Sequence, residues 1–307
     1  MQKAKPLQPG DTVGISAPSG CVQREDLLRG ISEIRRLGYQ VRYDDSLFSR
    51  HRYFAGSHRQ RAESLTDLFT DPGVKAIFCA RGGYGCQYLL ELLDPETLQA
   101  HPKIFLGYSD VTVLLQFLEN QCGLVCFHGP MVAKEFAQGE PYYVRDNLLH
   151  CLTGSRPGQR LQSHDSLTLQ AGTARGRLTG GCLSLLAASL GTPYEMQSRD
   201  RILFLEDINA KPYQVDRMLM QLKLAGKLEG VRGFVFGEMF GCGQAGQAPD
   251  IPEIVLGLLQ EFQVPIWYGL HSGHTSTGCL TLPFGVEVQL DAGQRWLQFE
   301  EVAVDAG

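Results

Sequence analysis

The sequence predicts an α/β protein with a doubly wound parallel sheet in its first half and a second, β-rich domain after it. The first half alternates short apolar runs with longer amphipathic ones, as in a parallel sheet covered by helices. The second half closes on short alternating runs such as VEVQL and RWLQF. Glycine, at 35 of 307 residues, exceeds its usual share of about 7%, which indicates many tight turns at strand ends.

The elements of the first half follow from these runs. DTVGISAP predicts the first strand, and the helix after it, over about 24–37, ends before Gly38, a good residue for a helix C-terminus. Further strands are expected at 40–43, 74–79, 104–107 and 124–127. Further helices are expected at 58–69, from about Tyr84, and at about 110–119. Four or five such strand–helix repeats form a doubly wound domain.

A change of composition predicts the domain boundary. Residues 152–177 are polar and rich in Gly, Ser, Pro and Gln, with SLTLQ as their only alternating piece, so we expect a linker there between domains at 1–151 and 178–307. The second domain is expected to hold an apolar helix after Gly180-Gly181, strands at 202–205, 233–236 and 265–268, and helices at 213–224 and 254–262.

Charge and composition exclude several classes of partner. A net charge of −5 with scattered basic residues argues against nucleic acid or anionic membrane as the partner. The amino terminus lacks the apolar core of a signal peptide, and no apolar run reaches 18 residues, so we expect a cytoplasmic protein. Nine irregularly spaced cysteines predict buried free thiols. The one close pair, Cys122 and Cys126, lacks a second Cys or His pair, so we expect no metal site. We expect no cofactor either.

The strongest local signal is IFLGYSD at 104–110, an apolar strand that runs into a serine at the start of a helix. Such a serine, Ser109, would lie at the carboxyl end of the sheet, where α/β proteins bind ligands and a helix offers backbone N–H groups. The alternative is that Ser109 or Asp110 merely caps the helix. Because Val111 replaces the last glycine of G-x-S-x-G, an ordinary α/β-hydrolase is not indicated.

A glycine-rich loop follows the preceding strand. In Arg81-Gly82-Gly83-Tyr84-Gly85 the glycines allow the backbone to approach a ligand and to present N–H groups to an anion or oxyanion. The loop lacks the spacing of a dinucleotide site and the lysine of a Walker loop, so a phosphate loop or a plain turn stays open as an alternative.

The second half offers an acid and a base. Glu206 and Asp207 end an apolar strand, and His274 follows another strand between turn residues. A carboxylate on the far nitrogen of a histidine fixes its tautomer and stabilises the imidazolium. Taken singly, each acid could cap a helix and the histidine could simply be solvated.

Together these residues resemble the serine-type LD-carboxypeptidase family, which also includes the microcin C immunity peptidases. The resemblance covers nearly the whole chain. Its blocks are APS at 17–19, ARGGYG at 80–85, GYSDVTVLL at 107–115, HGPM at 128–131, LEDINAKPYQVDRMLMQL at 205–222 and SGHTSTGCLTLPFG at 272–285.

The resemblance implies a role for each candidate. Ser109 would be the nucleophile, His274 the general base and acid, and Glu206 the orienting carboxylate. The backbone N–H groups of Gly83 and Asp110 would form the oxyanion hole. In the family pattern the Glu matches rather than Asp207. Adjacent strand residues point to opposite faces, so only one of the two acids can reach the cleft.

The family fold is a flavodoxin-like domain followed by a β-rich domain, with the cleft between them. Ser109 would then come from the first domain, and Glu206 and His274 from the second. One position departs from the family, which often reads Gly-Gly-Asn where this chain has Cys182 after Gly180-Gly181.

The implied activity is metal-independent hydrolysis that releases terminal D-alanine from peptidoglycan-derived tetrapeptides during cell-wall recycling. The partner is thus a small muropeptide, and a homodimer is expected. A carboxypeptidase must also bind the terminal carboxylate, for which Arg81 is our candidate, with Gly82 and Tyr84 beside it.

Two other functions stay open. The immunity branch cleaves an amide in a peptidyl or aminoacyl nucleotide and needs an aromatic residue to stack on the base. Trp267 lies in an expected strand, Trp296 lies near the end of the chain, and no tryptophan occurs at 180–200. In a non-catalytic binding protein the same crevice would hold a small anion, and Ser109 would be only a cap.

Overall fold

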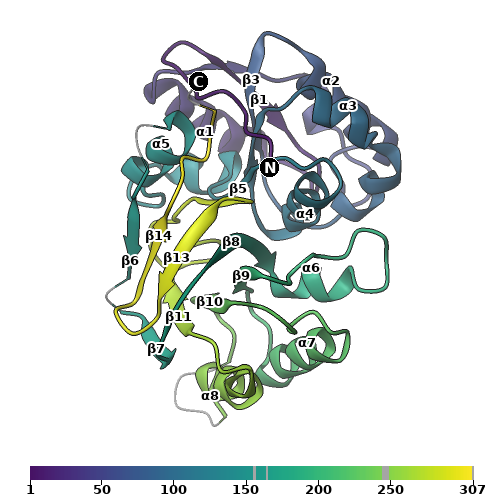
Figure 1. Cartoon of the computed structure of the whole chain (residues 1–307). Helices are drawn as coiled ribbons and strands as arrows, with labels where there is room; N and C mark the ends of the chain where they lie inside the picture. Colours follow the sequence, from purple (N-terminus) through teal and green to yellow (C-terminus); the bar gives the residue numbers. More distant parts are fainter. Residues whose placement is uncertain (155–156, 164, 244–248, 306–307) are drawn as a thin grey trace.

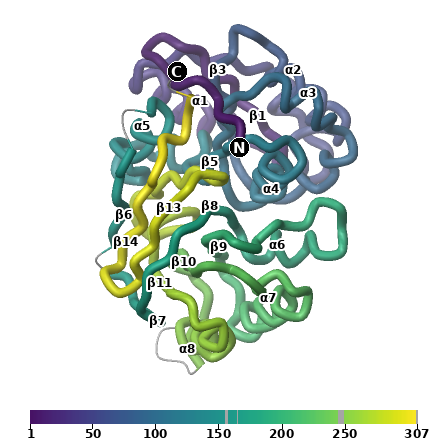
Figure 2. The backbone as a smooth tube through the Cα atoms, viewed as in Figure 1, coloured from purple at the N-terminus to yellow at the C-terminus, as the bar shows by residue number. Residues whose placement is uncertain are grey.

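The chain forms two sheets, one above the other in Figure 1. The computed structural model describes residues 1–154, 157–163, 165–243 and 249–305. One large apolar core includes residues of both sheets, and a second core lies between the second sheet and its helices. The segments near the two ends of the described chain meet, since Asp305 N donates to Ala4 O at 2.8 Å (Figures 1 and 2).

The first sheet has six strands in the order β12-β5-β4-β3-β1-β2. They are β1 (Thr12–Ser16), β2 (Gln40–Arg42), β3 (Val74–Cys79), β4 (Ile104–Gly107), β5 (Cys126–His128) and β12 (Leu282–Phe284). The first five run parallel, whereas β12 pairs antiparallel with β5. Because β12 comes from the last part of the chain, the second half contributes directly to the first sheet.

Helices cover both faces of this sheet. They are α1 (Arg24–Arg36), α2 (His58–Thr70), α3 (Pro95–Ala100), α4 (Thr112–Asn120) and α5 (Arg145–Thr153). In α1, acids in the first turn and arginines in the last complement the helix dipole, while Leu27, Ile31 and Ile34 are buried. A short turn, η4 (Val132–Phe136), packs on α1, and another, η2 (Cys86–Leu92), packs between α2 and α4.

The second sheet has eight strands in the order β6-β14-β13-β8-β9-β10-β11-β7. They are β6 (Arg160–Gln162), β7 (Leu167–Gln170), β8 (Thr173–Cys182), β9 (Arg201–Glu206), β10 (Gly233–Gly237), β11 (Ile266–Leu270), β13 (Glu287–Asp291) and β14 (Trp296–Phe299). Strands β8 to β11 run parallel and the flanking pairs are antiparallel. The helices α6 (Leu183–Ala188), α7 (Pro212–Leu224) and α8 (Ile251–Leu259) accompany the parallel strands. The predicted fold class is confirmed.

Several elements differ from the sequence-based expectations. Residues 152–177, where we expected a linker, contain β6, β7 and the start of β8. β6 and β7 are the two edge strands, which explains their polar, partly exposed sequence. The helix expected from Tyr84 begins at Cys86 as a 3₁₀ turn, because Gly83 and Gly85 adopt positive φ. The helices α3 and α5 and the strand β12 were not predicted.

The cysteines agree with one further expectation. All nine cysteines are free, and seven of them are buried, with Cys21 and Cys242 partly exposed. Within the described ranges, none of the helices has the length and apolar character that crossing a membrane requires.

Candidate active site

Ser109 lies at the carboxyl end of β4, a central strand of the first sheet. Its φ of +64° falls in the left-handed region, which a serine adopts only where the surrounding structure holds it. The 3₁₀ turn η3 (Ser109–Val111) follows and leads into α4. A cap alone does not require this strain, because helix-capping residues ordinarily adopt an extended backbone.

The glycine-rich loop lies directly against this serine. A Cβ added to Gly82 would come within 2.8 Å of Ser109 Cβ and 2.9 Å of its Oγ, and 3.6 Å from Asp110 N. Gly83 and Gly85 have φ values of +122° and +135°, which side chains rarely tolerate. The loop can therefore approach the serine closely only because it consists of glycines.

Asp110 ties three loops together at the same place. Its buried carboxylate accepts hydrogen bonds from Ser19 Oγ at 2.6 Å and from Cys86 N at 2.9 Å. It thus joins the loop after β1 and the end of the glycine-rich loop to the turn that carries Ser109. This carboxylate is a link between loops rather than a helix cap.

Glu206 and His274 form a buried pair at the carboxyl end of the second sheet. His274 Nδ1 lies 2.7 Å from Glu206 Oε2, and His274 N donates to the same oxygen at 3.0 Å. Burial acts to raise the pKa of Glu206, but the charge of His274 and its hydrogen bonds hold that pKa below the ordinary value. A Cβ at Gly273 would lie 2.7 Å from Glu206 Cδ, so this approach requires a glycine with φ +79°.

The adjacent acid, Asp207, faces away from this pair. Its Oδ2 accepts from Ser184 N at 2.7 Å, at the start of α6, and its Oδ1 accepts from Ile208 N at 2.8 Å. Burial raises the pKa of Asp207. The two acids therefore have different partners. Glu206 contacts the histidine, and Asp207 accepts from backbone N–H groups.

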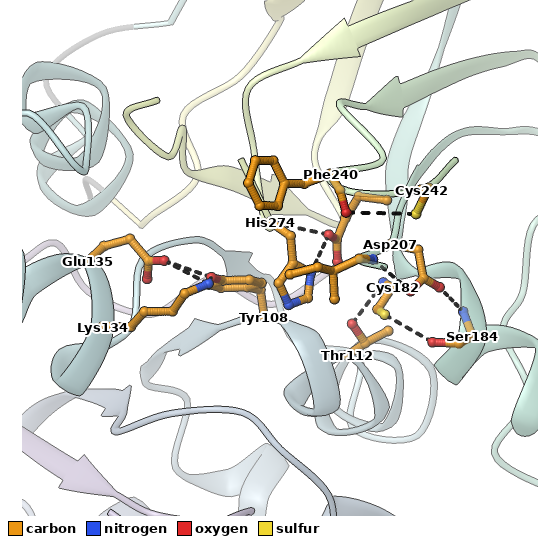
Figure 3. Close-up of polar contacts among 12 residues, drawn as sticks. Tyr108, Thr112, Lys134, Glu135, Cys182, Ser184, Asp207, Phe240, Cys242 and His274 are labelled. Carbon is orange, nitrogen blue, oxygen red and sulfur yellow. Dashed lines mark hydrogen bonds and ion pairs between the residues drawn. The ribbon is translucent and has the colours of Figure 1, made fainter. Parts of the chain in front are cut away.

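Tyr108 packs between His274 and a charged pair. Its ring lies edge-on to His274, with centroids 5.0 Å apart (Figure 3). Its hydroxyl donates to Glu135 Oε1 at 2.7 Å and accepts from Lys134 Nζ. Both Lys134 and Glu135 come from η4, beside the first sheet.

One cavity of about 320 Å³ brings the two halves together. Ser109 and His274 both line it, and no hydrogen bond joins them in the described part of the chain. The hydrogen bond with Glu206 occupies Nδ1 of His274, and the other ring nitrogen, Nε2, takes no part in this pair. In enzymes without substrate, catalytic hydrogen bonds are often long or absent, and they form only in the complex with substrate.

The predicted substrate-binding residues are split between two cavities. Arg81 and Gly82 line the cavity of Ser109, together with Gly83 of the predicted oxyanion hole. Arg81 is exposed and donates through Nη1 to Cys21 O at 3.0 Å. Tyr84 lines a separate cavity of about 580 Å³ with Tyr88, whose ring stacks on that of His58.

A polar seam joins α4, the helix that follows Ser109, to the second sheet. From α4, Thr112 Oγ1 accepts from Cys182 N at 3.0 Å, and Gln116 Nε2 donates to Gly180 O at 2.9 Å. Cys182 is the register partner of Glu206 in the neighbouring strand. Its thiol, for which the family often has an asparagine, contacts Ser184 Oγ at 3.3 Å, and burial raises its pKa.

The same seam contains a buried ion pair. Glu119, at the end of α4, accepts from Thr179 Oγ1 at 2.6 Å and pairs with Arg201 of β9. Burial raises the pKa of Glu119 to about 7, against the lowering effect of Arg201. Glu119 thus fixes the helix that begins beside Ser109 against the strand that ends at Glu206.

Sequence reasoning missed Lys134 and Tyr108. The signal was present, because Lys134-Glu135 is a charged pair four residues beyond the HGP motif in an otherwise apolar stretch. Tyr108, directly before the serine, was treated only as part of a strand end.

Comparison with known proteins identifies the family. Residues 13–129 match the LD-carboxypeptidase N-terminal domain and residues 175–290 match the LD-carboxypeptidase C-terminal domain. The "Probable murein peptide carboxypeptidase" of Bacillus subtilis is 34% identical over 304 residues, covering 95% of this chain and 92% of that protein.

Solved structures agree with this match. The crystal structure of muramoyltetrapeptide carboxypeptidase from Oxalobacter formigenes is 32% identical, with a TM-score of 0.84 over 95% of this chain and 99% of that one. A structure of MccF in complex with glutamyl sulfamoyl guanosine is 25% identical, with a TM-score of 0.91 over 99% and 100%. MccF is named the microcin C7 self-immunity protein of Escherichia coli. The chain belongs to the LD-carboxypeptidase family, as the sequence predicted, and is a serine carboxypeptidase.

Proposed function

We propose that this enzyme releases terminal D-alanine from peptidoglycan-derived tetrapeptides, with Ser109, His274 and Glu206 as its catalytic triad. The observation that carries the proposal is the shared cavity. A strained serine at a strand end and a histidine bound to a buried carboxylate line the same space. The names of the relatives support a muropeptide as the substrate.

In the proposed mechanism, His274 Nε2 takes the proton of Ser109 as Oγ attacks the carbonyl carbon of the L,D-amide. Glu206 holds the imidazole through Nδ1 and stabilises its positive charge. The tetrahedral oxyanion is stabilised by the N–H groups of Gly83 and Asp110, on the two loops that meet at Ser109. His274 then protonates the departing amine of D-alanine, and the C–N bond breaks.

Water completes the cycle by attacking the acyl-enzyme ester. His274 removes a proton from that water, and Ser109 leaves with the proton returned to its Oγ. Arg81 and Gly82 would contact the peptide near the scissile bond, since both line the cavity. Tyr84, in the neighbouring cavity, would contact a more distant part of the substrate.

The same proposal includes a cytoplasmic homodimer in which residues 1–151 carry the nucleophile and residues 178–307 carry the acid and base. The nine free thiols support a reducing compartment. The family resemblance supports the dimer, which light scattering on the purified protein tests. A single mass near 34 kDa would contradict it.

The test of function is release of D-alanine from a purified muramoyl tetrapeptide, by the wild type and by Ser109→Ala, with and without chelator. We expect release that survives the chelator and is lost in the variant. Release that persists in Ser109→Ala would exclude the serine as nucleophile. No release from any tetrapeptide would exclude the substrate.

The close match to MccF favours one alternative, cleavage of an aminoacyl nucleotide amide. Assaying an aminoacyl-sulfamoyl adenosine beside the tetrapeptide distinguishes the two, and the better substrate identifies the branch. A non-catalytic binding protein would bind either ligand without turnover. The strained Ser109 and the His274–Glu206 pair argue against it, because binding an anion requires neither.

A further inference from the structure

We propose that Lys134 is the residue that binds the free carboxylate of the substrate's terminal D-amino acid, so that it restricts the enzyme to cleavage at a chain end. The inference rests on the proposed function. A carboxypeptidase needs a cation on the leaving-group side of the scissile bond, and the position of Lys134 relative to His274 meets that need.

Lys134 is one of few charged side chains in the catalytic cavity. The ionisable residues that line it within the described chain are Asp26, Arg81, Lys134 and His274. Asp26 is paired with Arg29 on the surface of α1. Arg81 is exposed and already donates to Cys21 O. Lys134, with a side chain 41% exposed, lines the cavity, and its Nζ donates to Tyr108 OH.

Geometry places this cation beside the group that protonates the leaving amine. The Tyr108 ring centroid lies 4.9 Å from Lys134 Nζ and 5.0 Å from the ring centroid of His274 (Figure 3). In a D-amino acid the nitrogen and the carboxylate carbon are two bonds apart. With a hydrogen bond at each end, base and cation must lie roughly 6–9 Å apart. Two groups on one tyrosine ring can satisfy this separation.

The ammonium keeps a donor for a ligand. Of its three N–H groups, one donates to Tyr108 OH and one faces Glu135 Oε1 at 3.2 Å. Glu135 does not occupy the place of a substrate carboxylate, because it does not line the cavity. Its buried carboxylate accepts hydrogen bonds from Tyr108 OH and from Met131 N at 3.0 Å instead. A carboxylate entering the cavity would therefore meet the lysine before the glutamate.

The backbone that carries Lys134 is held firmly. Ala133 N donates to Ala80 O at 2.8 Å, at the end of β3. On the other side, a Cβ at Gly30 would lie 1.9 Å from Val132 O, so α1 and η4 touch through a glycine. The segment that carries Lys134 is therefore packed against both the first sheet and α1. A residue that determines specificity requires such a rigid support.

The experiment compares two substrates that differ only at the terminal group, a tetrapeptide ending in D-alanine and the same peptide ending in D-alaninamide. The variants are Lys134→Met, Lys134→Arg and Arg81→Met, with Lys75→Met as the matched control. Lys75 lies at the start of β3, outside the catalytic cavity. The ratio of kcat/KM for acid over amide is the readout, because a merely structural defect would lower both values alike.

We expect the wild type to prefer the acid by roughly 10- to 100-fold, as loss of one charged hydrogen bond implies. Lys134→Met should abolish most of that preference through the acid substrate alone, Lys134→Arg should keep it, and Lys75→Met should leave both rates unchanged. A wild-type ratio near one, equal losses on both substrates in Lys134→Met, or loss of the preference in Arg81→Met instead would overturn the inference. Release of D-alanine by the wild type separates all these outcomes from failure of the proposed function.

Discussion

The two sheets contribute to the site by different means. At the first sheet the contribution depends on the backbone, which holds Ser109 at φ +64° with a glycine loop against it. At the second sheet it is made by side chains: a buried glutamate and the histidine bound to it. The half at the first sheet, called the backbone half, depends on glycines that leave room for Ser109. The half at the second sheet, called the side-chain half, depends on the carboxylate of Glu206. The two halves should therefore fail in different ways when single residues are changed.

Glu206→Gln should have the largest effect. The amide keeps the shape of the side chain but removes the charge that stabilises the imidazolium, and loss of the corresponding charge in a serine triad costs about 10⁴-fold in kcat. We expect a loss of this order in D-alanine release with KM little changed. Thermal unfolding and circular dichroism of the variant serve as the control for folding. A loss below tenfold would show that the acid is not essential to this half of the site.

Arg201→Met tests the seam that holds the halves together. Removing one partner of a buried ion pair costs about 3–5 kcal/mol of unfolding free energy, because the other charge stays buried alone. The folded-state pKa of Glu119 already lies above the unfolded value, so its contribution to stability is lost as pH rises from about 4.5 to about 7. Without Arg201 that pKa rises further, so the loss continues above pH 7.

The difference in stability between the wild type and Arg201→Met should therefore be larger at pH 8.5 than at pH 5. Urea unfolding at both values measures it. Arg232→Met is the matched control, since its pair with Asp200 is exposed and should contribute less than about 1 kcal/mol at either pH. An equal cost at both pH values would mean that Glu119 does not titrate in the folded protein.

The sequence predicted the backbone half better than the side-chain half. IFLGYSD and ARGGYG are local patterns whose glycines and strand ends indicate where the chain turns. The Glu206–His274 pair joins residues 68 positions apart, and local patterns do not encode such distances. Only the family resemblance assigned it. Lys134 was not predicted for the same reason, because its place in the site follows from a contact with Tyr108, 26 residues earlier.

Edge strands and crossovers were the least predictable parts of the fold. β6 and β7 have the polar composition of a linker because they lie at the edges of their sheet. β12 belongs to the second half of the chain but pairs with β5 of the first sheet, and a short stretch of sequence does not encode such a long-range pairing. The buried parallel strands β1, β3, β4, β5, β9, β10 and β11, in contrast, are short apolar runs and were placed within a few residues. β8 is the exception, because TARGRLTGGC is not an apolar run and the strand was not predicted.

Gly82→Ala should affect activity more than stability. Gly82 does not have a positive φ, so alanine is allowed there, but its Cβ would lie 2.9 Å from Ser109 Oγ. Displacing the nucleophile by about 1 Å costs on the order of 10²-fold in rate.

Gly257→Ala in α8 is the matched control, because nothing lies within 4 Å of its Cβ. That change should stabilise the helix by about 0.5–1 kcal/mol and leave the rate unchanged. Normal activity in Gly82→Ala would show that the loop does not fix Ser109.

Asp207→Asn should have the smallest effect, and it tests why adjacent carboxylates differ. The amide keeps one oxygen acceptor but places an NH₂ group where Asp207 now accepts from Ser184 N or Ile208 N. Loss of one such hydrogen bond costs about 1 kcal/mol, measured by urea unfolding. D-alanine release should stay near the wild-type rate, because Asp207 does not contact His274. If Asp207→Asn reduced the rate as much as Glu206→Gln, the side-chain half of the site would depend on both acids, and the contrast between the two would fail.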